Sequence, residues 1–302
     1  MKKLRIFVCL PTHDNDFQLE QASSAEQAAE TLRIDLSLAY ANNDAVAQST
    51  QILKAMQGPR DSRPDAVIFE PVGSDALPRV AQAARDAGIG WAVLNREPEY
   101  IAEYRTKSGP LIFSLSSDHT DIGRIQGRQF AALLPNGGTL LYIEGPSHSS
   151  SAKKRTAGML ETKPHNIQIR TLKGQWTTES AERAVRSWLS LATSHKAAVD
   201  LVGAQDDSMA MGARYAFEGI ADAAVRDAWL KLPFTGCDGV PATGQAWVRS
   251  GLLAATVFIP PLAGQAIEMI ANAISNGKQP PEHSTTTSIS IPPLTALRPT
   301  KQ

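Results

Sequence analysis

The stretch that decides the fold reads DAVIFEPVGSDALPRVAQAARDAGIGWAVLNRE and occupies residues 65–97. The apolar run Ala66–Phe69 predicts a short buried strand, and Trp91–Leu94 predicts another. The residues between them predict a helix over 75–87, which Gly88 ends in the left-handed conformation that glycine adopts easily. Strand, helix and strand in this order are typical of a βαβ unit, whose two strands run parallel.

The same alternation continues on both sides of this stretch. Residues 34–40 alternate apolar and polar side chains, which is typical of a half-buried strand at the edge of a sheet. The pattern restarts near residue 118. In full, the other predicted strands are 5–10, 34–40, 111–115, 139–143, 167–172, 199–203, 233–237, 254–258 and 287–291, and the other predicted helices are 20–32, 44–56, 118–134, 150–162, 178–192, 207–218, 240–250 and 262–276.

Such alternation predicts an α/β protein with parallel sheets that carry helices on both faces. The restart near residue 118 predicts two doubly wound, Rossmann-like lobes, and a length of 302 residues agrees with two domains. Lysine and arginine number 30, as do aspartate and glutamate, so there is no positive excess to attract nucleic acid or an anionic membrane. The sequence therefore predicts no nucleic-acid partner.

The amino-terminal sequence and the two cysteines indicate the cellular compartment in which the chain is expected. The apolar run Ile6–Leu10 is too short for a signal peptide, which needs ~7–15 apolar residues, so the chain as written is expected in the cytoplasm. A missing upstream signal segment would instead place it in the periplasm. Cys9 and Cys237 fall in different predicted lobes, so both are expected to be reduced.

Polar and aromatic side chains recur directly after the predicted strands. Ligands of open parallel sheets bind beyond the carboxyl ends of the strands, so these positions are candidate ligand contacts. Carboxylates, amides and guanidinium groups bond adjacent hydroxyls in pairs, and aromatic rings pack on the C–H face of a sugar. We therefore expect a small polyhydroxylated ligand. The positions include Asn15, Asp16, Phe17, Glu70, Asn95, Arg96, Asp118, Arg155, Trp176, Asp206, Asp207 and Asp238.

Eight segments carry a family resemblance: LPTHDNDF (10–17), DAVIFEPVGSDAL (65–77), WAVLNRE (91–97), SSDHTDIGRIQG (116–127), EGPSHSSSAKKRTAGM (144–159), AQDDSMAMGA (204–213), TGCDG (235–239) and GLLAATV (251–257). With them the chain resembles the type 1 periplasmic-binding-protein family, in the ribose- and galactose-binding branch that is shared with LacI-type effector domains. The resemblance implies two lobes joined by three crossovers, with a cleft that closes on one sugar-like ligand.

The resemblance also implies boundaries and site residues. The amino-terminal lobe would comprise 1–117 and 260–287, and the carboxyl-terminal lobe 118–259 and 288–302. The chain would be a monomer without cofactor or metal. Glu70 is also a candidate ligand contact, because it directly follows a predicted strand. The family's ligand positions fall on Asn15, Phe17, Asn95, Arg96, Arg155, Trp176, Asp206 and Asp238.

Five positions depart from the family pattern. Gln18 stands where a second aromatic residue is frequent, and Ile259 stands where an amide is usual. Glu70 and Asp206 add carboxylates, whereas Asn95 replaces a common aspartate. An extra buried carboxylate must meet a donor, so neutral or cationic ligands are expected to bind better than anionic ones.

Each candidate also has a purely structural interpretation. Asp238 and Asp118 could cap the helices predicted to follow them, and Arg155 could be a solvated charge. Phe17 and Trp176 could simply belong to the core.

The two aspartates at 206–207 are expected to have different roles: Asp206 faces the ligand, and Asp207 caps the next helix. No metal-ligand spacing and no catalytic signature of a P-loop, nucleophile elbow or zinc protease occurs. The sequence therefore predicts no enzyme.

The leading interpretation is a solute-binding protein for a sugar or polyol, working either with an ABC permease or as a ligand sensor with a regulator protein. One alternative is a stand-alone effector-sensing domain related to LacI-type regulators. The first strand is predicted at residue 5, which leaves no helix-turn-helix before it, so the chain is not expected to read DNA. A further alternative is an enzyme that uses an acid pair such as Glu70 and Asp206.

Overall fold

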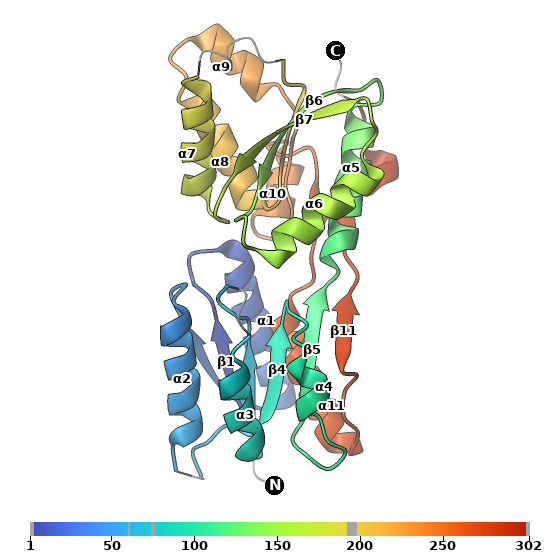
Figure 1. The fold of residues 1–302 in the computed structure, drawn as a ribbon. Coiled ribbons are helices and arrows are strands. Elements are labelled where there is room, and N and C mark those ends of the chain that lie inside the picture. The colour runs from blue at the N-terminus through green and yellow to red at the C-terminus, as the bar shows by residue number, and fades with distance from the viewer. Residues whose placement is uncertain (1–2, 60, 74–75, 192–197, 300–302) are drawn as a thin grey trace. The chain divides into compact units, whose positions relative to one another are not determined.

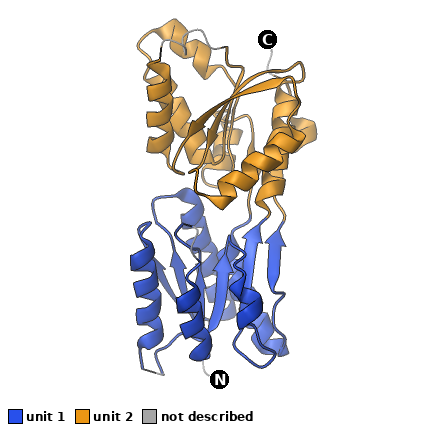
Figure 2. Cartoon of the chain, viewed as in Figure 1, with its two compact units in different colours: residues 1–117, 260–286 blue, residues 118–259, 287–302 orange. Residues whose placement is uncertain are grey.

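The computed structural model describes residues 3–59, 61–73, 76–191 and 198–299 (Figure 1). The chain divides into two compact units, shown in different colours in Figure 2. Unit 1 comprises Met1–Ser117 and Pro260–Thr286, and unit 2 comprises Asp118–Ile259 and Thr287–Gln302. Each unit contains a parallel sheet with flanking helices, so the predicted α/β class is confirmed.

Unit 1 is built on a six-stranded sheet in the order β11-β5-β4-β3-β1-β2, and all neighbouring strands run parallel. The alternating segment β2 lies at an edge, as its pattern predicts. The edge strand β11 was not predicted, because its sequence, HSTT, has no apolar residue. The bounds are β1 Arg5–Leu10, β2 Asp35–Tyr40, β3 Ala66–Phe69, β4 Gly90–Leu94, β5 Ile112–Ser117 and β11 His283–Thr286.

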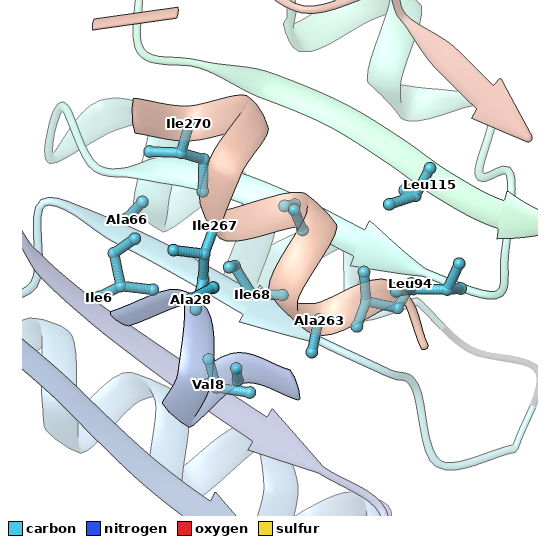
Figure 3. Packing of buried hydrophobic residues seen from close by; sticks show 14 of the residues in the cluster. Ile6, Val8, Ala28, Ala66, Ile68, Leu94, Leu115, Ala263, Ile267 and Ile270 are labelled. Carbon is cyan, nitrogen blue, oxygen red and sulfur yellow. The ribbon is translucent and has the colours of Figure 1, made fainter. Parts of the chain in front are cut away.

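Alternate side chains of these strands enter two cores on opposite faces of the sheet. Ile6 and Val8 pack against α1 and α11, whereas Phe7 and Cys9 belong to the cluster that includes residues of α2 and α3. Figure 3 shows the first cluster, in which Ala28 and Ala263 are small enough to let the two helices approach. The helices are α1 Asp16–Leu32, α2 Ala45–Gln57, α3 Pro78–Asp86, α4 Tyr100–Tyr104 and α11 Leu262–Asn276.

Two helices of unit 1 begin three or more residues away from their predicted starts. Helix α1 starts at Asp16 rather than residue 20, because the Asn15 side chain accepts hydrogen bonds from the first-turn amides. Helix α3 starts at Pro78, whose fixed φ suits a first helical position, and the predicted start at residue 75 lies outside the described residues. Gly88 follows α3 with φ +71°, as predicted.

Unit 2 contains a parallel four-stranded sheet in the order β7-β6-β8-β9. A separate antiparallel pair, β10 with β12, departs from the all-parallel expectation. The strands are β6 Gly138–Glu144, β7 Ile167–Lys173, β8 Leu201–Ala204, β9 Phe234–Thr235, β10 Thr256–Phe258 and β12 Ile289–Ile291. The helices are α5 His119–Leu133, α6 Ser150–Thr162, α7 Thr178–Leu189, α8 Asp207–Glu218, α9 Ala223–Leu230, α10 Gly244–Arg249 and the 3-10 turn Leu294–Ala296.

Helices α5 and α6 pack almost backbone to backbone. A Cβ atom on Gly123 would overlap the carbonyl of Arg155, and one on Gly158 would overlap the carbonyl of Thr120. This close packing fixes the position of α6, which carries Arg155. Among the described helices, none is long and apolar enough to span a membrane.

Candidate ligand-binding residues

Asn15 and Phe17 lie where β1 passes into α1. The Asn15 Oδ1 atom accepts hydrogen bonds from the backbone N–H groups of Phe17 and Gln18 at 2.9 and 3.2 Å. Phe17 is only 9% exposed but belongs to neither hydrophobic cluster of unit 1 as described. Its ring is therefore buried outside those cores, at the carboxyl edge of the sheet.

Glu70 follows β3 and is half-buried. Its Oε2 atom accepts a hydrogen bond from Gln18 Nε2 at 3.0 Å. The buried side chain of Gln48 holds the turn, because it donates to the Glu70 carbonyl at 2.8 Å and accepts from the Val72 N–H at 2.9 Å. Gln18 thus serves as a polar support for the Glu70 carboxylate.

Asn95 and Arg96 follow β4 and are held in a tight turn. Asn95 has φ +56°, a left-handed conformation that asparagine tolerates better than most residues. Arg96 donates from Nη1 to the Asn95 carbonyl at 2.7 Å and from Nη2 to the Gly73 carbonyl at 3.0 Å. Burial lowers the pKa of Arg96, and the negative charge of Glu70 acts in the opposite direction.

Arg155, on α6, brings three predicted residues of unit 2 together. Its guanidinium carbon lies 5.5 Å from the ring centroid of Trp176, and Nη1 lies 3.6 Å from Asp238 Oδ1. Nη1 also donates to the carbonyl of Gln205. Burial lowers the pKa of Arg155, but the neighbouring Cys237, Asp238 and Asp206 outweigh it, so the pKa is raised overall. The interpretation of Arg155 as a solvated charge is therefore wrong, because the residue is 6% exposed.

Asp238 follows β9 and forms an isolated parallel β-bridge with Phe258, with φ +104°, a strained backbone conformation for a residue other than glycine. Its backbone N–H donates to the Val257 carbonyl at 2.9 Å, and its carbonyl accepts from the Ile259 N–H at 3.0 Å. It does not cap a helix, because α10 begins at Gly244 rather than at residue 240. Two main-chain hydrogen bonds thus hold Asp238 beside Arg155.

The doublet after β8 corrects an expectation. Asp206 is the N-cap of α8, because its Oδ1 atom accepts from the Met209 N–H at 2.5 Å. Asp207 is not the cap: its buried carboxylate accepts from the Gly239 N–H at 2.7 Å and from Thr256 Oγ1 at 2.6 Å. Asp206 therefore caps the helix, and it does so with one of its two carboxylate oxygen atoms.

Trp176 lies in the turn after β7, with φ +63° and a half-buried side chain. Its ring packs so closely on Gly145 that a Cβ atom there would overlap it. Gly145 directly follows β6, so the absence of a side chain at that position lets the indole reach the carboxyl edge of the sheet.

Gln205, fully buried at the end of β8, was not predicted. Its Oε1 atom accepts from the Gly145 N–H at 2.8 Å, and Nε2 donates to the Ala152 carbonyl at 3.0 Å and to Thr156 Oγ1 at 2.9 Å. It therefore ties the glycine under Trp176 to the helix that carries Arg155. The signal in the sequence was a polar residue directly after the apolar strand LVGA.

The remaining candidates have structural roles. Asp118 caps α5 through the Asp121 N–H at 2.9 Å, in line with its structural interpretation. Cys9 and Cys237 are free and buried, one in each unit. Within the described ranges, no group of three or more histidine, cysteine, aspartate or glutamate residues could hold a metal ion.

The fold and these positions agree with the comparison with known proteins. The model of the family described as "Periplasmic binding protein domain" matches residues 6–279. The chain belongs to this family, and the resemblance predicted from the sequence is confirmed.

Individual relatives are distant. A protein of Rhizobium meliloti, provisionally named rhizopine-binding, is 28% identical over 208 residues, which is 66% of this chain and 63% of that protein. The ribose import binding protein of Salmonella typhimurium is 24% identical over 284 residues, covering 92% of this chain and 87% of its own. As predicted, these relatives are named as binding proteins rather than enzymes.

The fold itself is shared with solved structures. A periplasmic solute-binding protein of an ABC transporter from Actinobacillus succinogenes, with bound D-allose, superimposes with a TM-score of 0.80. Its sequence is 22% identical, and the match covers 95% of this chain and 97% of that one.

Proposed function

We propose that this chain is a solute-binding protein that holds one small sugar or polyol. The observation that carries this proposal is the group formed by Arg155, Trp176 and Asp238 in unit 2. A guanidinium and a carboxylate can each bond two adjacent hydroxyls, and an indole can cover the apolar face of a ring. Asn15, Phe17, Glu70, Asn95 and Arg96 of unit 1, with Asp206, complete the proposed set.

The chemistry of the relatives supports the same class. Their names and titles mention ribose, rhizopine and D-allose, so the family model alone does not select one solute. Gln18 and Ile259, which replace a frequent aromatic residue and a usual amide, argue against a simple pentose. The proposed solute is therefore a sugar or polyol whose pattern of polar groups differs from that of ribose.

We further propose that the protein works in the periplasm as the receptor of an ABC importer. The family is that of periplasmic binding proteins, and the Salmonella relative is named an import binding protein. Growth on the solute should then require both this chain and a cognate permease. Growth that depends on a signalling partner instead would identify a ligand sensor.

A thermal-shift screen tests the binding function. The purified chain, with a chelator present, is heated with neutral pentoses, hexoses, sugar alcohols and cyclitols. A solute at 100 times its dissociation constant stabilises by ~2.7 kcal/mol. In a chain of this size, that raises the melting temperature by several degrees. At least one compound should do so for the native chain and fail with Arg155→Ala. No shift across the whole panel would contradict the proposal.

A further inference from the structure

A buried carboxylate at the end of β6 lies between the elements that carry Arg155 and Trp176. Glu144 is the last residue of β6, and its side chain is 9% exposed. Resting on the proposed function, we propose that Glu144 is a positioning residue for solute binding: it holds the helix that carries Arg155 and the turn that carries Trp176 in their relative places. In this role Glu144 does not itself contact the solute.

The two carboxylate oxygens of Glu144 bind different elements. Oε1 accepts a hydrogen bond from the hydroxyl of Thr156 at 2.8 Å, and Thr156 directly follows Arg155 in α6. Oε2 forms an ion pair with the ammonium group of Lys173. Lys173 is the last residue of β7, at the register position opposite Glu144 and shortly before Trp176. One side chain thus connects α6 with the end of β7.

Further hydrogen bonds support both connections. The Glu144 carbonyl accepts from the Gly174 N–H at 2.7 Å, which fixes the start of the turn that leads to Trp176. Thr156 Oγ1 donates to Glu144 and also accepts from Gln205 Nε2 at 2.9 Å. The Thr156 hydroxyl therefore has a defined donor on one side and a defined acceptor on the other, so its orientation is fixed.

Burial makes the Glu144 carboxylate sensitive to the loss of either partner. A charge removed from water must meet hydrogen-bond donors, and loss of one partner leaves an uncompensated buried charge. The guanidinium carbon of Arg155 lies 5.5 Å from the ring centroid of Trp176. Because a displacement of about 1 Å is enough to impair a preorganised binding site, loosening of α6 against β7 should weaken solute binding.

Acrylamide quenching tests the connection in the protein without solute. The fluorescence of Trp176 is obtained as the difference between each protein and the same protein with Trp176→Phe. Glu144→Leu removes both side-chain interactions, so the quenching constant of Trp176 should rise about twofold or more as the turn loosens. Glu144→Gln keeps an acceptor for Thr156 and places a neutral amide beside Lys173, so its effect should be smaller.

Calorimetry tests whether the connection serves binding. The titrant is the compound with the largest thermal shift among D-ribose, D-allose, D-galactose, D-sorbitol and myo-inositol. Thr156→Val should weaken binding about fivefold or more, because it removes the hydroxyl that Glu144 and Gln205 share. Thr162→Val is the matched control: Thr162 is also a half-buried threonine of α6, and its hydroxyl donates to the Arg124 carbonyl at 2.8 Å. Both variants should lose stability, but the control should keep native affinity and native quenching of Trp176.

A double-mutant cycle tests the ion pair. Lys173→Met should weaken binding in the native background, because it leaves the buried Glu144 carboxylate without its cation. In the Glu144→Gln background it should cost little further affinity, since the ion pair is already absent. Fully additive losses would show that Lys173 acts on the solute directly and would overturn its role as a partner of Glu144.

The outcomes separate this inference from the proposed function. Native quenching of Trp176 in both Glu144 variants, or native affinity in both Glu144→Gln and Thr156→Val, would overturn the positioning role while the binding function stands. These two milder variants carry the test if Glu144→Leu does not fold. If none of the five compounds binds, the proposed function fails, and the quenching measurement still decides whether Glu144 holds the Trp176 turn.

Discussion

At the scale of single residues, the polar groups after the strands divide into two kinds. Some, such as Asp207 and Asp118, stabilise the fold, since their oxygens accept hydrogen bonds from neighbouring backbone or hydroxyl groups. Others, such as Asp238 and Arg155, contact each other at the carboxyl edge of a sheet. Sequence alone cannot separate them, because the residue types are the same and only the partners differ.

This division predicts opposite effects for two aspartates. Asp238→Asn should weaken solute binding by roughly tenfold to a hundredfold, the value of one charged hydrogen bond of ~1.5–3 kcal/mol, with a smaller effect on folding. Asp207→Asn should instead lower the free energy of unfolding by ~1–3 kcal/mol, because its buried oxygens bond Gly239 and Thr256. Urea denaturation and calorimetry on both variants check this. Equal effects of the two variants on affinity would contradict the assigned roles.

A pH effect is also expected from a single residue. Burial raises the pKa of the Cys9 thiol from 9.0 to about 12, with a smaller opposing effect from a side-chain hydrogen bond. The folded protein therefore holds this proton more tightly than the unfolded chain does. The stabilisation is complete below pH 9.0 and is lost as the pH rises towards about 12, so the free energy of unfolding should fall over this range.

Urea denaturation at a series of alkaline pH values measures this fall. Burial also raises the pKa of Cys237 and Tyr142, so part of the slope should remain without Cys9. Cys9→Ala should give a shallower slope, by up to ~1.4 kcal/mol per pH unit. An identical slope in the variant would show that Cys9 does not titrate in this way.

At the scale of elements, the buried apolar segments were predictable and the polar or short ones were not. β1, β3, α8 and α11 have their predicted bounds because an apolar run or stripe marks each of them. α4 has five residues and α9 buries none of its side chains, so neither has a clear pattern in sequence. Helix α1 was predicted to start too late because its first turn is stabilised by a cap rather than by an apolar stripe.

The candidate binding residues were likewise predictable only in part from the sequence. Strand ends could be located from sequence, which is why Arg155, Trp176 and Asp238 were found although they lie far apart in the chain. The hydrogen bonds of Gln205 could not be predicted, because they depend on how β6, β8 and α6 meet.

Substitution of Gln205 tests whether its hydrogen bonds position the proposed binding residues. Gln205→Leu removes three hydrogen bonds that hold Gly145 and α6, so it should weaken solute binding at least several-fold through Arg155 and Trp176. The matched control is Gln129→Leu, because Gln129 is equally buried in unit 2 and donates to Thr256 and Ser290. Both variants should lose stability.

The distinguishing measurement is the coupling between positions 205 and 155. If Gln205 acts through Arg155, its replacement should cost little further affinity in the Arg155→Lys background, whereas Gln129→Leu should cost no affinity in either. An affinity loss that is fully additive with Arg155→Lys would show that Gln205 does not position the arginine.

At the scale of the whole molecule, two α/β units each bring polar groups to the carboxyl edge of a sheet. The prediction of this fold class and of the family is confirmed, because both depend on a strand and helix alternation that runs through most of the chain. The identity of the solute depends on a few side chains, and these include the positions at which the chain departs from the family pattern. Together the two units lead to one expectation that can be measured, that the chain binds a single small sugar or polyol.

Isothermal titration calorimetry measures this binding and its stoichiometry. The native chain, Arg155→Ala and Arg155→Lys are titrated with the panel compound that gives the largest thermal shift. We expect one saturable site per native chain, and at least tenfold weaker binding in both variants, with folding retained by circular dichroism. No saturable heat from the native chain would contradict the binding of a solute, and native affinity in both folded Arg155 variants would contradict the role of Arg155.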